Sequence, residues 1–177
     1  VSIMTTTGFV TTNFDVWSTA AKYTLLVLMF VGACAGSTGG AIKVSRILLM
    51  LKYGRIELLR AIHPNAVIQV KLSGVPVKEE ALRSILSFIN QYVLIFVVAV
   101  LMVAANCYIA KVDMDMIDLT SAVATSMGNV GPGLGKLFLD FHALPNFSKM
   151  VMFLCMWIGR LEIIPAIVLL VPEFWKK

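Results

Sequence analysis

Long apolar segments alternate with short polar ones along this chain of 177 residues. Residues 84–110 and 147–171 form two apolar segments, each long enough for one membrane-spanning helix, which takes roughly 20 apolar residues. Residues 20–34 supply only part of a span before a break rich in glycine and serine, after which a helical pattern resumes over 42–59. Because irregular backbone at membrane depth is tolerated where it lines a cavity, this pattern predicts a broken transmembrane helix. We therefore expect an all-α integral membrane protein.

The polar segment between the broken helix and the next span predicts a cytoplasmic connection over residues 60–83. His63 precedes a proline, which pushes its backbone out of the α region and ends the helix there. Residues 67–77 alternate weakly between apolar and polar positions around a Ser73-Gly74 turn, which predicts a short hairpin or loop. A helix is expected to resume over residues 78–82.

Residues 118–135 combine a short, mostly apolar stretch with a glycine-rich turn, and they lie between two predicted spans. Asp118 is expected to be the N-cap of a short helix that ends near Met127, since a carboxylate accepts the unpaired amide protons of a helix start. Such a helix followed by irregular backbone is typical of a re-entrant pore loop. Residues 5–9, which also precede an apolar segment, form a second candidate loop.

Two loops of similar plan predict tandem span–pore-helix–span units, an internal repeat found in channels and transporters. Residues 84–177 would form one whole unit, and residues 1–59 the back half of another. The chain starts in polar, threonine-rich sequence with no signal peptide, so we expect further chain before Thr5.

Both loops contain a glycine at the centre of a segment that resembles the TVGYG filter of potassium channels. The aligned positions are Thr6, Thr7, Gly8 and Phe9 in the first loop, and Asn129, Val130, Gly131 and Pro132 in the second. Glycine lets successive carbonyl groups point to one side, and a ring of carbonyls can replace the hydration shell of a monovalent cation. We therefore expect K⁺ at the backbone of Thr6, Thr7, Gly8, Asn129, Val130 and Gly131. An ordinary glycine-rich turn at a membrane surface is the alternative.

The glycine-rich break is a candidate gate, since glycine allows a loop to move and hydroxyl groups can contact ions or water. The residues concerned are Gly36, Ser37, Thr38, Gly39 and Gly40. The spacing Gly32-xxx-Gly36-xxx-Gly40 also fits a pattern by which small residues pack two membrane helices together. A nucleotide-binding loop is not expected, because the GK[ST] sequence of a Walker A loop is missing.

Arg160 lies in the middle of the last predicted span, where a charge is costly and indicates a function. Glu162 is two residues further along and does not share its helix face, so we expect Arg160 to face the pore. A structural salt bridge to another repeat is the alternative.

Composition agrees with a membrane protein: 59% of the residues are hydrophobic, 14% are charged, and the mean hydropathy is +0.87. The three cysteines are isolated within apolar segments and are expected to be core residues rather than disulfides or metal ligands. No enzymatic activity is expected, because the serine and threonine residues of 118–135 have no nearby histidine.

The net charge of +5 is unevenly distributed, which predicts the orientation of the chain rather than binding to nucleic acid. Most basic residues lie between the first two long apolar segments, and four acids lie between the second and the third. The basic residues are Lys43, Arg46, Lys52, Arg55, Arg60, Lys71, Lys78 and Arg83, and the acids are Asp113, Asp115, Asp118 and Asp140. Residues 43–83 and the C-terminus are therefore expected in the cytoplasm. A basic patch that faces lipid or a nucleotide is compatible with the same topology.

Five motifs stand in the order seen in one known family: TTTGF, GACAGSTGGAIK, HPNAV, GNVGPGLG and GRLEI. They resemble the membrane subunits of the Trk/Ktr/HKT potassium transporter family, TrkH type, over nearly the whole chain. This resemblance implies four span–pore-helix–span repeats around one pore, of which the chain corresponds to the end of the third and the whole fourth. It also implies that the glycine-rich break is a gate beneath the filter and that Arg160 projects into the permeation path. The filters depart from TVGYG, which fits less strict selectivity.

The resemblance further implies potassium uptake across the bacterial cytoplasmic membrane, by symport or by channel-like conduction. K⁺ would be the transported ion, with no tightly bound cofactor. The expected partners are a second copy of the protein, the lipid bilayer and a cytosolic nucleotide-binding regulatory subunit of the TrkA type, with RCK domains. The alternative function is secondary transport of another monovalent cation, coupled to Na⁺ or H⁺, with the binding site at the helix break.

Overall fold

The computed structural model describes residues 1–32, 34, 36–37, 39–63, 69–72, 74–138 and 140–161. The described chain is mostly helical. Its α-helices are α1 (Thr19–Phe30), α2 (Val44–Ile62), α3 (Glu79–Ile109), α4 (Met116–Gly128) and α5 (Asn146–Leu161), with 3-10 turns η1 (Phe14–Val16) and η2 (Gly135–Leu137). Short strands β1 (Val31–Gly32), β2 (Ile42–Lys43), β3 (Lys71–Leu72) and β4 (Val75–Pro76) form two pairs.

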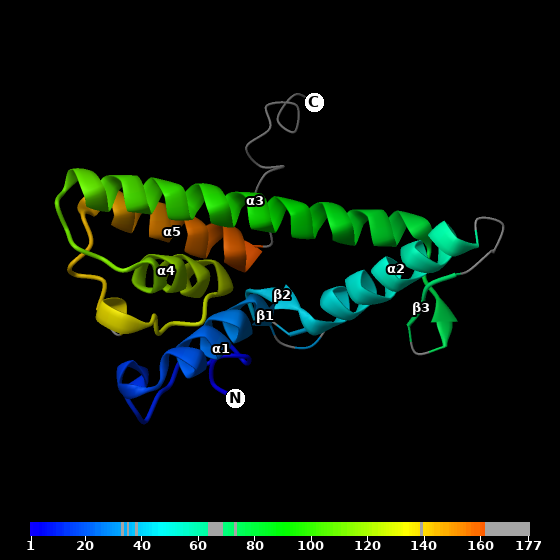
Figure 1. Cartoon of the computed structure of the whole chain (residues 1–177), viewed down its shortest axis with the longest axis horizontal. Helices are drawn as coiled ribbons and strands as arrows, with labels where there is room; N and C mark the ends of the chain where they lie inside the picture. Colours follow the sequence, from blue (N-terminus) through cyan, green and yellow to red (C-terminus); the bar gives the residue numbers. More distant parts are fainter. Residues whose placement is uncertain are drawn as a thin grey trace.

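The long helix α3 runs the length of the molecule, and α4 and α5 pack against it and against each other (Figure 1). Its 31 residues include a window of mean hydropathy 2.5, so α3 is long and apolar enough to cross a membrane. It is the one helix among the described residues that meets this test, while α1 is a shorter apolar helix. The predicted last span reaches beyond α5, and its residues 162–171 lie outside the described chain.

Two separate helices stand where the sequence predicts a broken transmembrane helix, since α1 ends at Phe30 and α2 begins at Val44. Between them β1 pairs in parallel with β2, with Val31 opposite Ile42 and Gly32 opposite Lys43. The all-α prediction missed this pairing. The described residues from Gly32 to Gly40 are not helical, so the alternative that these glycines pack two helices together is wrong.

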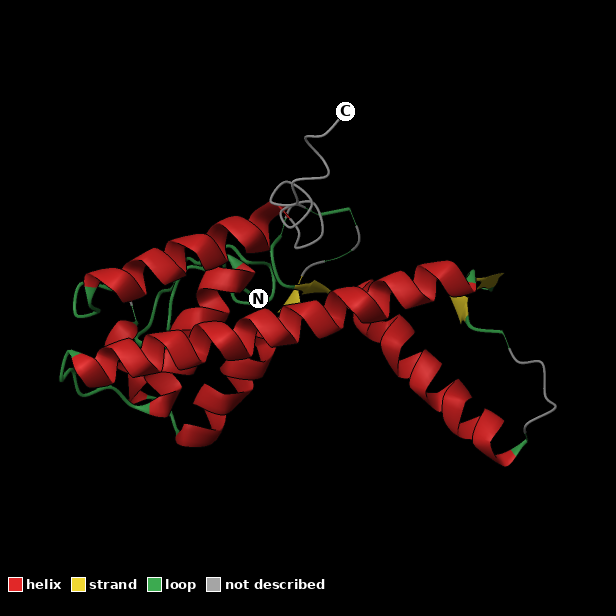
Figure 2. Ribbon diagram, turned by 90° about the horizontal axis from the view of Figure 1, so that it is seen from above, coloured by secondary structure: helices red, strands yellow, loops and turns green. Residues whose placement is uncertain are grey.

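The predicted hairpin is confirmed, because β3 pairs in antiparallel with β4. Its neighbour Val70 packs with Leu49 of α2 and Leu82 of α3 into a small apolar cluster. In Figure 2 the helix α2 runs at an angle to α3, and the hairpin lies near the end of α3. This cluster packs α2, the start of α3 and the hairpin together.

Two element boundaries agree with the sequence patterns. Helix α2 ends at Ile62, immediately before His63, and α3 begins at Glu79, where a helix was expected to resume, and continues without a break into the predicted span. Glu79 and Glu80 stand in the first turn of α3, where negative charge interacts favourably with the helix dipole. The predicted connection 60–83 therefore contains the ends of two helices, and the division of the chain into repeats stays a prediction.

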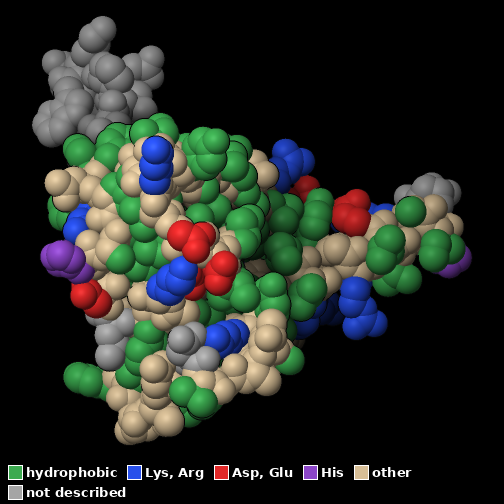
Figure 3. All heavy atoms as spheres, turned by 60° about the vertical axis from the view of Figure 1, so that its left-hand side comes forward, with side chains coloured by type: hydrophobic (Ala, Val, Ile, Leu, Met, Phe, Trp, Pro, Cys, Tyr) green, Lys and Arg blue, Asp and Glu red, His purple; other side chains and the backbone are tan. Residues whose placement is uncertain are grey.

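Helix α4 is buried on nearly every side, which is unusual for a helix of 13 residues. It packs on α3 and α5 through one apolar cluster that includes Val103, Val123 and Cys155. A second cluster, which contains Met29, Ala124 and Val130, joins it to α1 and to the N-terminal segment. By contrast, charged side chains of both signs are visible at the end of the molecule formed by the loops around α4 and along the projecting arm of α2, as Figure 3 shows.

A buried polar contact ties α3 to α5: the Asn106 amide donates to the Ser148 hydroxyl at 2.8 Å, and Ser148 is fully buried. We expect Ser148→Ala to lower the stability of the folded protein by about 1 kcal/mol, because hydrogen bonds between membrane helices contribute about that much. Thermal unfolding in detergent measures this, with exposed Ser84→Ala as the control. An unchanged unfolding temperature for Ser148→Ala would contradict the prediction.

Candidate functional site

The two predicted filter segments meet in the structure, although 123 positions separate their central glycines. A Cβ atom added to Gly8 would lie 2.5 Å from the Val130 carbonyl oxygen, closer than side chains ever come. A Cβ atom added to Gly131 would lie 3.5 Å from the Cα of Gly8. The two backbones are therefore packed directly against one another, and only glycine fits at position 8.

Both segments have the same alternation of backbone conformation. Thr6 and Asn129 are left-handed, each with a φ of 52°, and two residues later Gly8 and Gly131 have φ values of 81° and 112°. The residue between each pair has negative φ. Left-handed backbone is uncommon outside glycine, so its recurrence at aligned positions is a specific similarity.

The helical turn before each segment also ends in the same way, in a Schellman motif. In this motif two amides beyond the last turn donate to carbonyl groups in it, around one left-handed residue. The bonds run from Thr7 to Ser2 and from Thr6 to Ile3 in the first segment, and from Val130 to Thr125 and from Asn129 to Ser126 in the second, with N···O distances between 3.0 and 3.3 Å. The motif normally has glycine at the left-handed position, and here threonine and asparagine take its place.

The loop after α4 runs back along that helix and is bonded to one of its faces. Three buried side chains, spaced three and four residues apart, accept backbone amides of the loop. Thr125 Oγ1 accepts from Gly131 at 3.0 Å, Ser121 Oγ from Leu134 at 3.0 Å, and Asp118 Oδ1 from Lys136 at 3.2 Å. Irregular backbone that is buried here therefore has partners for its amides, as burial requires.

The sequence did not predict that these three side chains hold the loop. The spacing of Asp118, Ser121 and Thr125 on one face of a short helix before a glycine-rich loop is the signal that could have indicated it. The predicted cap was wrong too: the N-cap of α4 is Asp115, and Asp118 stands three residues later in a capping box. Asp118 Oδ2 accepts the Asp115 amide at 3.1 Å, so one carboxylate serves both the helix start and the loop.

The exit end of the glycine-rich break lies against the base of the second filter segment. A Cβ atom on Gly40 would collide with the Gly128 carbonyl group and would lie 3.3 Å from the Asn129 nitrogen. Earlier in the break, Gly36 has a φ of 87° and open space around it, and the Ser37 hydroxyl donates to the Cys34 carbonyl at 2.8 Å. Thr38, a predicted gate residue, lies outside the described residues.

Arg160 lies in the last described turn of α5 and is exposed there. Its neighbour Gly159 packs on the Met127 carbonyl, where a Cβ atom would not fit. The helix turn that carries the arginine is thus in direct contact with the end of α4. The structure brings this turn and the exit of the break together at Gly128 and Asn129, whereas the direction of the Arg160 side chain stays a prediction.

The electrostatics of this junction favour a cation. Helix α4 ends at Gly128, immediately before the filter segment, and the C-terminal end of a helix carries a partial negative charge. No basic residue stands in its last turn. Among the described residues, no group of three or more His, Cys, Asp or Glu side chains could hold a metal ion. The two segments contain no acidic side chain, so the oxygen atoms that they can offer to an ion are those of the backbone, the hydroxyl groups and the Asn129 amide.

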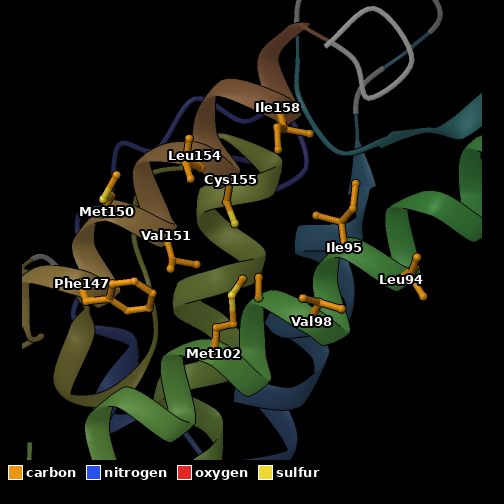
Figure 4. Close-up of a pocket in the computed structure, with 11 residues that line it drawn as sticks. Leu94, Ile95, Val98, Met102, Phe147, Met150, Val151, Leu154, Cys155 and Ile158 are labelled. Carbon is orange, nitrogen blue, oxygen red and sulfur yellow. The ribbon is translucent and has the colours of Figure 1, made fainter. Parts of the chain in front are cut away.

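A separate groove of about 330 Å³ lies between α3 and α5 and is lined entirely by apolar side chains, including Val98, Met150 and Leu154 (Figure 4). It shares no residue with either filter segment. The groove is therefore a surface feature of the helix pair rather than part of the site.

Comparison with known proteins agrees with this geometry. The chain is 40% identical to the Trk system potassium uptake protein TrkH of Halomonas elongata, 42% to that of Vibrio parahaemolyticus and 37% to that of Escherichia coli, in each case over 177 residues. Each alignment covers 100% of this chain and 35–36% of the relative, so the chain spans about a third of the length of these relatives.

A solved structure has the same fold. The crystal structure of the potassium transporter TrkH from Vibrio parahaemolyticus superposes with a TM-score of 0.86 at 42% identity, over 99% of this chain and 36% of that one. The family model TrkH, described as a cation transport protein, matches residues 1–177. The chain therefore belongs to the TrkH family of cation transport proteins.

Proposed function

We propose that the protein takes up potassium across a membrane through a central pore to which this chain contributes two filter segments. The observation that carries this proposal is the packing of Gly8 on the Val130 carbonyl, between two segments with the same alternating backbone. Such backbone can present carbonyl oxygens to a dehydrated monovalent cation. The names of the relatives as potassium uptake proteins support potassium as the ion.

The proposed ligands are the backbones of Thr6, Thr7, Gly8, Asn129, Val130 and Gly131, with Phe9 and Pro132 closing the two segments. The Ser2 hydroxyl donates to the Phe9 carbonyl at 2.6 Å, which engages that oxygen and supports its exclusion from the ligand set. Two further segments, from chain outside these residues, would complete a ring of four. Selectivity for potassium over sodium would depend on how rigidly the ring is held.

The proposed gate is the glycine-rich break together with Arg160. Gly36, Ser37, Thr38, Gly39 and Gly40 would form a movable loop beneath the filter, held at its exit by the contact of Gly40 with Gly128. A guanidinium group is always charged, so Arg160 near the path would raise the barrier to a cation. Contact between the loop and Arg160 would close the pore.

Rubidium uptake by the full-length protein in liposomes tests the function. We expect potassium to block the uptake, because both ions would occupy the same carbonyl ring. Secondary transport of another monovalent cation, with its site at the helix break, would leave rubidium uptake indifferent to potassium.

The proposed assembly is a homodimer in the bacterial cytoplasmic membrane, with residues 43–83 and the C-terminus on the cytoplasmic side. A cytosolic nucleotide-binding subunit of the TrkA type, with RCK domains, would dock on the basic surface of α2 and the hairpin. Arg55 and Lys71 are exposed there, and Arg60 is partly neutralised by Glu57 at 3.0 Å. The Lys52 ammonium donates to the Lys71 carbonyl, which holds the hairpin against α2.

Arg160→Ala should raise cation flux several-fold, because the barrier of a fixed positive charge is removed. Arg160→Lys, which keeps the charge, is the matched control and should stay close to the wild-type flux. Rubidium flux into liposomes measures both variants. Unchanged flux and unchanged gating in Arg160→Ala would remove the arginine from the proposed gate.

Thr125→Val should reduce discrimination between potassium and sodium by up to roughly tenfold, because the Gly131 amide loses its acceptor and one hydrogen bond contributes about 0.5–1.5 kcal/mol. Thr120→Val is the control, since among the described residues that hydroxyl bonds to carbonyls of its own helix alone. Competition of sodium with rubidium uptake gives the ratio. Equal ratios in the two variants would show that the Thr125 hydroxyl does not hold the filter.

Neutralising Arg55, Arg60 and Lys71 to glutamine should weaken binding of the cytosolic subunit roughly tenfold, since each exposed ion pair contributes about 0.2–1 kcal/mol. A pulldown with the full-length protein measures this, and added salt should weaken wild-type binding in the same direction. Lys136→Gln with Lys149→Gln, in η2 and the first turn of α5 at the opposite end of the molecule, serves as the control. Undiminished binding of the triple variant would rule out this surface.

A further inference from the structure

Among the proposed filter residues, Asn129 has a side chain that bonds to another helix of the described chain. Its Nδ2 atom donates to the Met156 carbonyl of α5 at 3.2 Å. In an α-helix the carbonyl of one residue accepts the amide of the residue four positions on, so the Met156 carbonyl is the acceptor for Arg160. The side chain at the base of the filter is thus bonded to the same carbonyl group as the backbone of the arginine.

The absence of a side chain at Gly159 allows the hydrogen bond between Asn129 and α5. A Cβ atom on Gly159 would lie 3.2 Å from Asn129 Nδ2, so the helix turn approaches the side chain closely. On the other side, Gly40 of the break approaches the Asn129 backbone nitrogen. Both elements of the proposed gate therefore touch one residue of the filter.

The equivalent position in the first segment lacks this link. Thr6 has the same φ of 52° and stands at the same place in its Schellman motif. Within the described part of the chain, the Thr6 hydroxyl makes no hydrogen bond. A left-handed residue at this position favours glycine, and asparagine is the next most tolerant side chain. Asn129 satisfies the backbone requirement and adds an amide that reaches α5.

We propose that Asn129 is a positioning residue that couples the gate to the filter. Its amide fixes the base of the fourth-repeat segment to the turn of α5 that carries Arg160, so a movement of that turn changes the geometry of the filter. This inference rests on the proposed pore function. Under this proposal, the segment that contains Asn129 responds to movement of α5. The segment that contains Thr6 is held independently of α5.

The test uses the full-length protein in liposomes and compares Asn129→Gly with the matched control Thr6→Gly. Each change keeps the left-handed backbone, and only Asn129→Gly removes a bond to another helix. We expect Asn129→Gly to lower the potassium-to-sodium selectivity ratio about threefold to tenfold, the range for one interhelical hydrogen bond. Thr6→Gly should leave the ratio within about twofold.

The second measurement combines each change with Arg160→Ala. In the wild-type filter, loss of the arginine should change both the flux and the selectivity ratio, because the turn and the filter are coupled. In the Asn129→Gly background it should still raise the flux but leave the ratio unchanged, which a merely structural role of Asn129 would not produce.

The same ratio in Asn129→Gly and Thr6→Gly, or a response of the ratio to Arg160→Ala that is equal in both backgrounds, would overturn the coupling. These outcomes are distinct from failure of the pore proposal itself. That failure would appear in the wild-type protein, as rubidium uptake that potassium does not block.

Discussion

Buried backbone that is not helical or in a sheet must still have partners for its amides and carbonyls, and the site depends on this constraint. The loop after α4 meets it by running back along the helix, where Thr125, Ser121 and Asp118 accept three of its amides. Without these side chains three amides of the glycine-rich segment would lose their acceptors, and the segment would be held less firmly in one conformation. Helix α4 is therefore more than a spacer, since its side chains set the shape of the loop that follows it.

The same constraint explains why α4 carries hydroxyl groups although it is buried on nearly every side. A buried serine or threonine is unfavourable without a hydrogen-bond partner, and here the partners are the loop and the carbonyls of α4 itself. The small size of these residues also lets α3 and α5 approach the helix closely. Polar and packing requirements are thus met by the same positions.

Backbone at the junction of Gly128 and Asn129 is approached by two other elements, and each approach requires a residue without a side chain. Gly40 meets the Gly128 carbonyl, and Gly159 meets the Met127 carbonyl. Since these contacts are made by backbone, they cannot be relieved by rotation of a side chain. Movement of either element must therefore displace the start of the segment 129–132 or open a gap beside it.

The amino-acid sequence by itself determined the features that depend on neighbouring residues. The length of its apolar segments predicted α3, the break between α1 and α2 and the start of α5, and the turn residues after His63 predicted the hairpin. The central glycines of the two candidate filter segments indicated where the backbone needs a freedom that other residues lack, and Gly8 and Gly131 both have positive φ. These are local properties, because chain length, hydropathy and glycine act within a few residues.

Only the tertiary structure decided that Asp118 holds the loop as well as the helix start, because that role depends on the amide of Lys136, 18 positions later. It also decided that β1 pairs with β2 across the break and that the Asn129 side chain bonds to α5. No local pattern encodes such contacts, since each needs two distant segments to be placed together first. The candidate site was therefore predictable in its glycines and its position along the chain, while the bonds that hold it in shape arose from the packing of α4 between its neighbours.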